Sequence, residues 1–330
     1  MDKKERFTGC LLGQCLGDAL GFIVEGEPRT TCKEYVDTCL RARRIPEGRR
    51  GPFTFGQYSD DSQLARELMQ SYVDRRRFDP ADYARRIAAI FAERRIVGGG
   101  GATTIAAHRL IQGMPWQEAG TPPPSAGNGT AMRAAPIGLI FFEDPTRLAQ
   151  AAHDQGRITH TDPRCSAGSV IIAGVVAHVV RDGRVQRDQL LGELEELAAP
   201  HGDDFVNGLT QMAEWLALSP DEAHRPIASA GQEERAWPGI TPFVVPSVLW
   251  SLYAFLRTPE DYWETICTAI ACGGDVDTTA AMAGAMSGTC NGLSALPSAY
   301  LEYLHDRDTW HYDALVRLAH DAWAVKRRDL

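Results

Sequence analysis

Two short stretches of the chain place aspartates beside hydroxyl residues. The segment YSDDSQL (58–64) contains two adjacent aspartates, and the segment GGDVDTT (273–279) contains two aspartates one residue apart. Carboxylates this close repel each other unless a positive charge lies between them. Hard divalent cations such as Mg2+ and Mn2+ prefer carboxylate and hydroxyl oxygens as ligands. The two segments together offer six such side chains: Ser59, Asp60, Asp61, Asp275, Asp277 and Thr278. Six ligands suffice for two ions about 3.5 to 4 Å apart that share a bridging carboxylate, with a single ion as the alternative.

Each segment also fits a purely structural role at the start of a helix. Asp60 and Asp61 precede an amphipathic run that begins at Leu64, and carboxylates are favoured there by unpaired N–H groups and the helix dipole. Asp277 can cap the helix that follows it in the same way. The occurrence of the same composition at two helix starts favours a metal site, but residue chemistry alone leaves two N-caps open.

Two other motifs match parts of GGDVDTT without fitting their context. DVDTT agrees with the D-x-D-x-T motif of haloacid-dehalogenase-like phosphatases, but that motif follows a buried strand near the N-terminus of an α/β domain. Here it follows ACGG near the C-terminus of a chain with helical patterns. An EF-hand loop needs glycine at its sixth position, where this chain has Ala280. Neither motif explains the segment.

Helical periodicity predicts the elements that must position these side chains. Apolar residues recur at helical spacing in three segments: 64–72, 83–91 and 248–255. Helix starts are marked by Asp79 with Pro80 and by the stretch that ends at Asp261. Alternating strand patterns of useful length and repeats of period 20 to 50 are missing from the sequence. We predict an all-α protein of a dozen or more helices, with residues 1–330 in one compact domain.

The segment after Asp277 predicts a helix of very small residues. Ala280, Gly284 and Gly288 are spaced by four, a pattern that lets neighbouring backbones approach closely, and the helix is too short to span a membrane. We expect it to be a central core helix with the acidic residues at its N-terminus. The longest apolar run, 165–180, is also shorter than a span and contains His178, so it predicts a buried core helix.

Composition indicates a globular protein. The chain has 330 residues, 44% of them hydrophobic, and 34 basic against 43 acidic residues give a net charge of −9. No Lys/Arg block suggests a nucleic-acid or membrane footprint, and the apolar N-terminal segment has no signal cleavage site. The eight cysteines form no C-x-x-C pair, which predicts buried, reduced thiols. We expect a cytoplasmic monomer.

The chain resembles the ADP-ribosylglycohydrolase family, which includes the dinitrogenase-reductase-activating hydrolase and the eukaryotic ADP-ribosylhydrolases. Four stretches carry the resemblance in the family's order: GCLLGQCLGDALGFIVE (9–25), YSDDSQL, GNGTAMRAAPIGL (127–139) and GGDVDTTAAMAGAMSG (273–288). The resemblance implies an all-α orthogonal bundle with two Mg2+ or Mn2+ ions at helix N-termini, held by the six side chains named above. Ser59 stands where the family commonly has threonine, and its hydroxyl can ligate equally well.

The resemblance also implies residues that act on or bind the substrate. Glu25 falls where the family places a glutamate close to the metals and the scissile bond, and Asp60 or Asp61 is a second candidate for the general base. The resemblance implies that two glycine-rich stretches and two further residues bind ADP-ribose: Gly98, Gly99, Gly100 and Gly101; Ser125, Gly127, Asn128 and Gly129; His160 and Phe243. Four glycines alone are typical of a flexible loop, but before a helix they can present N–H groups to a diphosphate. Phe243 replaces a tyrosine common in relatives and keeps its stacking surface.

These residues predict an enzyme that hydrolyses the glycosidic bond between ADP-ribose and a modified target and releases ADP-ribose. Protein arginine is the favoured target by resemblance, with serine, nucleic-acid and free ADP-ribosyl metabolites as alternatives. A non-catalytic, crystallin-like ADP-ribose-binding protein is the alternative from another class. Such relatives have lost metal ligands, whereas all six positions here carry oxygen side chains.

Overall fold

The computed structural model describes residues 1–46, 50–231 and 239–328. Within these ranges the chain forms sixteen α-helices, one π-helical turn (Val36–Leu40) and three 3-10 turns, and no β-strand. The prediction of an all-α fold is therefore confirmed. The α-helices are Lys3–Phe22 (α1), Arg29–Tyr35 (α2), Asp60–Arg75 (α3), Pro80–Ala92 (α4), Gly101–Ile111 (α5), Ala135–Phe141 (α6), Pro145–Arg157 (α7), Pro163–Asp182 (α8), Arg187–Ala198 (α9), Asp203–Leu216 (α10), Pro220–Ala228 (α11), Val244–Arg257 (α12), Tyr262–Ile270 (α13), Val276–Asn291 (α14), Ser298–Leu301 (α15) and Tyr312–Lys326 (α16).

The helix starts that the sequence marks are real. The Asp79 side chain accepts a hydrogen bond from the backbone N–H of Asp82 at the start of α4, and Asp261 accepts one from Glu264 at the start of α13. Each carboxylate satisfies a backbone donor that has no partner inside its helix. The predicted apolar segment 248–255 lies within α12.

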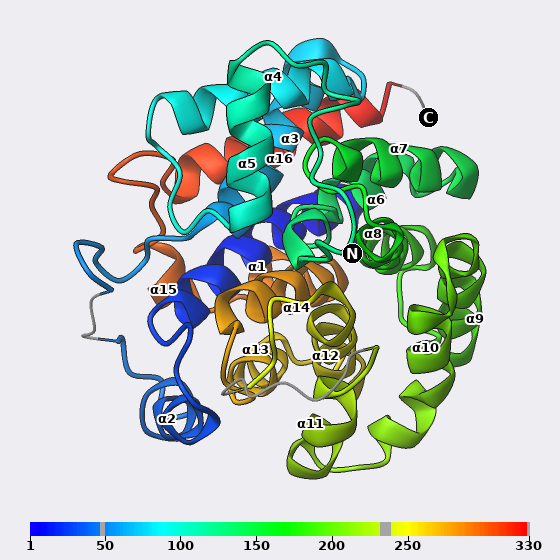
Figure 1. The fold of residues 1–330 in the computed structure, drawn as a ribbon. Helices are drawn as coiled ribbons and strands as arrows, with labels where there is room; N and C mark the ends of the chain where they lie inside the picture. The colour runs from blue at the N-terminus through cyan, green and yellow to red at the C-terminus, as the bar shows by residue number, and fades with distance from the viewer. Residues whose placement is uncertain (47–49, 232–238, 329–330) are drawn as a thin grey trace.

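Helices α1 and α14 form an antiparallel pair at the centre of the bundle (Figure 1). Glycines repeat every fourth residue along α1 and face the small residues of α14, so the two backbones almost touch. A Cβ atom on Gly13 would lie 2.4 Å from the carbonyl oxygen of Gly284, and one on Gly9 would lie 2.2 Å from that of Gly288. The predicted core helix of small residues is therefore confirmed. Because the pair is antiparallel, the end of α1 lies beside the start of α14.

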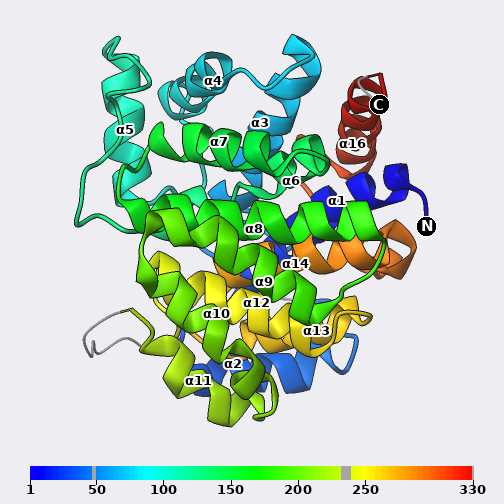
Figure 2. The ribbon, with the colours of Figure 1, turned by 90° about the vertical axis from the view of Figure 1, so that its right-hand side faces the viewer.

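The long apolar run lies in α8, which crosses the bundle between α7 and α9 (Figure 2). Its length and composition would suit a membrane span, but 89% of its apolar window is buried inside the protein. It is therefore best read as the core helix that the sequence predicts. All eight cysteines are free thiols, and six of them are buried.

Candidate active site

Helix α1 joins the two aspartate segments. Asp18, which is fully buried in α1, accepts hydrogen bonds from the backbone N–H of Ser59 at 2.8 Å and from that of Ser62 at 3.0 Å. These bonds fix the first turn of α3 against α1. Near the end of α1, a Cβ atom on Gly21 would lie 2.6 Å from the Cα atom of Asp277, so α14 begins at the same place. The two segments meet because both helix starts pack on α1.

The carboxylates at this junction form two overlapping groups of three. Asp18, Asp61 and Asp277 each place one oxygen within 4.8 Å of the others, and so do Glu25, Asp275 and Asp277. The Oδ1 atom of Asp61 is buried and has no hydrogen-bond partner among the described residues. Carboxylate oxygens that converge in this way fit one or two hard divalent cations, and Asp277 is common to both groups.

The electrostatics of the junction agree with this fit. Burial, followed by the neighbouring carboxylates Asp18 and Glu25, raises the pKa of Asp60 to about 8. Burial also raises the pKa of Asp18 to about 7 and that of Asp275 to about 6. The pKa values of Asp61 and Asp277 are raised well above the ordinary value, again chiefly by burial. Protons must therefore neutralise these groups unless a bound cation allows them to ionise.

Hydrogen bonds orient the aspartates of the two segments. Ser59 caps α3; its hydroxyl donates to Oδ2 of Asp61 at 2.7 Å and accepts from the Asp61 N–H at 3.3 Å. On the other segment, the Thr278 hydroxyl donates to Oδ1 of Asp275 at 3.2 Å, and the Asn128 amide donates to Oδ2 at 2.5 Å. The buried Ser59 hydroxyl is thus hydrogen-bonded to the proposed ligand Asp61. The side-chain amide of Asn128 is hydrogen-bonded to another proposed ligand, Asp275.

The reading of Asp277 as a simple N-cap is wrong. Asp275 holds the cap position of α14, its side chain makes no capping hydrogen bond, and Asp277 lies inside the first turn. Neither carboxylate is therefore explained by helix capping alone.

A cavity of about 260 Å³ connects the carboxylates to both glycine-rich stretches. The predicted site residues that line it are Glu25, Asp60, Asp61, Gly98, Gly100, Gly101, Ser125, Gly127, Asn128, Gly129, His160, Asp275, Asp277 and Thr278. Most of the residues predicted from the sequence are thus brought to one place, although they come from six separate segments.

The loop before α5 contacts the carboxylate of Asp60 and also lines the cavity. Gly98 has a φ of +85°, and a Cβ atom there would lie 3.1 Å from Oδ1 of Asp60, so the position favours glycine. The backbone N–H of Gly100 lowers the pKa of Asp60, against the larger effect of burial. Gly101 begins α5, whose N-terminus therefore borders the cavity.

Three predicted residues lie outside the cavity lining. One is Ser59, and another is Gly99, where an added Cβ atom would lie 3.2 Å from the ring of Phe91. The third is Phe243, whose backbone pairs with that of the cavity-lining Gly127. The guanidinium of Arg164 lies over the Phe243 ring, 5.2 Å from the ring centroid. Phe243 is therefore next to the cavity wall, and the stacking role remains a prediction.

His160 enters the cavity as a neutral imidazole. Its Nδ1 lies 2.9 Å from the hydroxyl of Thr159, and that hydroxyl also accepts a hydrogen bond from Arg133 at 2.8 Å. Burial and then the positive charge of Arg133 lower the pKa of His160 to about 3. The ring can offer a ligand a hydrogen bond but no charge at neutral pH.

Sequence reasoning missed part of the site. Ala102, Thr103 and Pro242 also line the cavity and lie outside the four stretches that carry the resemblance, and Met132 lies within one of them but had no assigned role. Asp18 had a readable signal, because it is the one charged residue in the largely apolar run 7–22. A buried charge in such a helix usually has a specific partner.

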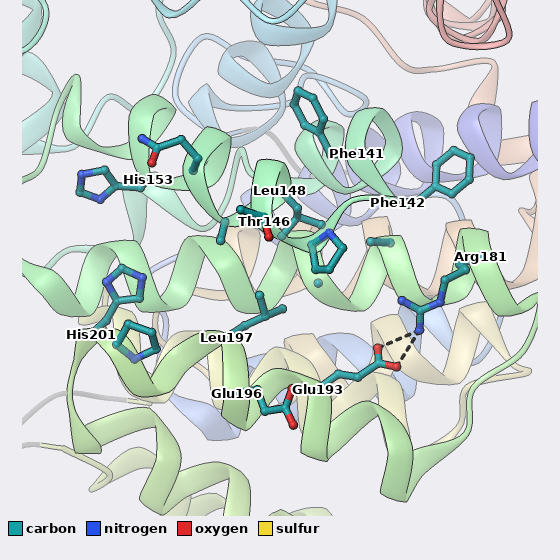
Figure 3. A pocket seen from close by; sticks show the side chains of 16 residues that line it. Phe141, Phe142, Thr146, Leu148, His153, Arg181, Glu193, Glu196, Leu197 and His201 are labelled. Carbon is teal, nitrogen blue, oxygen red and sulfur yellow. Dashed lines mark hydrogen bonds and ion pairs between the residues drawn. The ribbon is translucent and has the colours of Figure 1, made fainter. Parts of the chain in front are cut away.

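A larger cavity, of about 810 Å³, lies between α7, α8 and α9 and is mostly apolar (Figure 3). None of the site residues predicted from the described part of the chain lines it. Nearby, His178, Asp182 and Glu193 also converge within 4.8 Å, but Arg181 donates to both carboxylate oxygens of Glu193, at 2.7 and 2.9 Å. A guanidinium already supplies the positive charge there, so the smaller cavity is the candidate active site.

Comparison with known proteins identifies the family of the chain. The ADP-ribosylglycohydrolase family pattern matches residues 1–329. The chain is 28% identical to ADP-ribosylhydrolase ARH3 of Gallus gallus, with 89% of this chain and 88% of that protein covered. It is 26% identical to ADP-ribosyl-[dinitrogen reductase] glycohydrolase of Rhodospirillum rubrum, with 91% and 90% covered. A solved structure, "ADP-ribosylglycohydrolase-related protein complex", superposes with a TM-score of 0.73 at 27% identity and covers 98% of this chain and 99% of that one. The chain therefore belongs to the ADP-ribosylglycohydrolase family and is a glycoside-hydrolysing enzyme.

Proposed function

We propose that the enzyme removes ADP-ribose from modified protein side chains, arginine first among them, in a reaction that depends on Mg2+ or Mn2+. One observation carries the proposal: four carboxylates of the two groups that share Asp277, namely Glu25, Asp61, Asp275 and Asp277, line the same cavity as two glycine-rich stretches. The carboxylates suit a divalent cation, and the glycine-rich stretches suit the diphosphate of the substrate.

The cation would be held by oxygen atoms from the two aspartate segments. Asp60, Asp61, Asp275 and Asp277 are the proposed carboxylate ligands, with the hydroxyls of Ser59 and Thr278 beside them. An all-oxygen set of this kind favours Mg2+ or Mn2+ over zinc. When bound, such a cation supplies a Lewis acid and a water of lowered pKa.

Glu25 is the proposed proton acceptor. It lines the cavity, and its side chain is 28% exposed, so both water and substrate can reach it. The carboxylate accepts a proton from the attacking water as the water oxygen bonds to the anomeric carbon of the ribose. The bond from that carbon to the arginine nitrogen breaks, and the nitrogen takes up a proton. Asp60 and Asp61 are the alternative acceptors.

The remaining cavity residues would orient the ADP-ribose. The N-terminus of α5 can offer backbone N–H groups to the diphosphate, and the stretch from Ser125 to Gly129 lies across the same cavity. His160 would contribute a neutral hydrogen bond. These local dipoles and the cation outweigh the net charge of −9, which bears mainly on solubility.

Arginine is the first linkage to test because the carboxylate of Glu25, which lines the cavity and is partly exposed, can attract the positive charge of a guanidinium leaving group. The name of the Rhodospirillum rubrum relative also describes a modified protein as its substrate. Serine-linked ADP-ribose is the second candidate, because several relatives are named ADP-ribosylhydrolase ARH3 and are not tied by that name to arginine.

A release assay with arginine-, serine- and nucleic-acid-linked ADP-ribose, each with and without EDTA, tests the proposal. We expect the arginine-linked substrate to be cleaved fastest and EDTA to abolish cleavage. Asp277→Asn should lower kcat/KM by about a hundredfold or more and weaken Mg2+ binding measured by titration calorimetry. Asp182→Asn, in the group of carboxylates occupied by Arg181, is the matched control. Full activity after complete metal removal would contradict the mechanism.

A further inference from the structure

The guanidinium of Arg50 makes three polar contacts with Phe22 and Glu25, at and just after the end of α1. One guanidinium nitrogen, Nη1, donates to the carbonyl oxygens of Phe22 at 3.1 Å and of Glu25 at 2.8 Å. The other, Nη2, lies 2.7 Å from Oε2 of Glu25. The guanidinium also lies over the Phe22 ring, 4.9 Å from its centroid. A single side chain thus holds both the backbone and the carboxylate of Glu25.

Glu25 lies between this cation and two aspartates. One of its carboxylate oxygens is within 4.8 Å of oxygens on Asp275 and Asp277, and its Oε2 is paired with Arg50. A divalent cation at the aspartates and the guanidinium of Arg50 would therefore compete for the same carboxylate. Both side chains are only partly exposed, 35% for Arg50 and 28% for Glu25, so water screens their attraction incompletely.

We propose that Arg50 is a positioning residue that keeps Glu25 at the edge of the cation site instead of letting it become a full cation ligand. This inference rests on the proposed function, because it assigns Glu25 the work of accepting a proton. A glutamate that donates its electron pairs to a cation is a poorer base than one held beside it. The positive charge of Arg50 also opposes cation binding nearby.

Two effects of Arg50→Ala follow: cation binding should become tighter, while catalysis should become slower. The Kd for Mg2+ should fall, by about threefold to tenfold, because Glu25 becomes available as a ligand and a repelling charge is gone. The kcat for release of ADP-ribose should fall by about tenfold or more, with little change in KM, because the proton acceptor is displaced. A mutation that merely loosened the fold would weaken cation binding, so a tighter Kd separates positioning from a structural role.

The experiment measures Mg2+ binding by titration calorimetry and single-substrate kinetics for wild type, Arg50→Ala and Arg50→Lys. Arg50→Lys keeps the charge but not the forked geometry, so its Kd and kcat should lie between the other two. It also provides the comparison if Arg50→Ala does not fold. Arg41→Ala is the matched control, since Arg41 is a partly exposed arginine that pairs with Asp37 and Glu264 and does not touch Glu25.

The double variant Arg50→Ala/Glu25→Gln tests the route of the effect. If the tightening passes through the Glu25 carboxylate, most of it should vanish when Arg50→Ala is made in the Glu25→Gln background. An unchanged or weaker Kd in Arg50→Ala, or the same tightening in both backgrounds, would overturn the inference. Wild type that binds Mg2+ but releases no ADP-ribose would refute the proposed function, while the Kd comparison would still decide the role of Arg50. Wild type that binds neither Mg2+ nor Mn2+ would overturn both.

Discussion

Removal of divalent cations should make the stability of the protein fall as pH rises through neutrality. In the cation-free protein, the pKa values of Asp18 and Asp60 are raised to about 7 and about 8, above the ordinary 3.8. Between the ordinary pKa of 3.8 and these raised pKa values, the folded protein holds protons that the unfolded chain has released. Stability from such groups is present at low pH and is lost as pH rises through the folded-state pKa.

The size of the effect follows from the two pKa values. Each proton held by the folded protein alone changes the free energy of unfolding by about −1.4 kcal/mol per pH unit. Between about pH 6.5 and 8, Asp60 and Asp18 alone should remove about 2 kcal/mol of stability, which corresponds to several degrees in Tm. Asp61 and Asp277, whose pKa values are raised well above the ordinary value, act in the same direction and add to the fall. Below about pH 6.5 the buried His160, whose pKa is lowered to about 3, has the opposite effect, because its unfolded form still binds a proton there.

Urea unfolding in EDTA and in saturating Mg2+, at several pH values in this window, measures the effect. The stabilisation by Mg2+ should grow with pH, because a bound cation favours the ionised carboxylates. Asp60→Asn should make the fall in stability with pH smaller in EDTA, whereas the exposed Asp221→Asn should leave the pH dependence unchanged. If stability in EDTA is constant or rises from about pH 6.5 to 8, the assignment of raised pKa values to this site is wrong.

Three further predictions follow from other parts of the structure. Gly284→Ala would place a Cβ atom 2.2 Å from the carbonyl oxygen of Gly13, and should destabilise the protein by about 3 kcal/mol or more in chemical denaturation. The control Gly192→Ala, in α9 with nothing within 4 Å of the added atom, should be neutral or stabilising by up to about 1 kcal/mol. His160→Gln should not change the fall of kcat/KM at acidic pH, because the His160 imidazole is neutral in that pH range. A loss of this fall in the variant would contradict the lowered pKa of His160. Asp18→Asn keeps one acceptor oxygen for two backbone donors, and should weaken Mg2+ binding by about ten- to a hundredfold; an unchanged Kd would show that Asp18 does not position α3.

Local pattern accounts for what could be predicted from the sequence. The 3.6-residue periodicity and the caps at Asp79 and Asp261 predict helices correctly, because each depends on neighbours within one or two turns. The composition of the two aspartate segments predicts helix starts rich in oxygen ligands. The spacing of Ala280, Gly284 and Gly288 predicts close backbone packing, although the pattern does not name the partner helix.

Only the tertiary structure decides which of these features meet. The antiparallel register of α1 on α14 brings Glu25 to Asp275 and Asp277, and the hydrogen bonds of Asp18 bring the start of α3 to the same place. Arg50 reaches Glu25 only because the chain returns to the end of α1 after α2. Contacts such as these join residues far apart in sequence, and their geometry depends on how whole helices pack. The residue types therefore determined which chemistry was available, while the packing of α1 decided which side chains share one site.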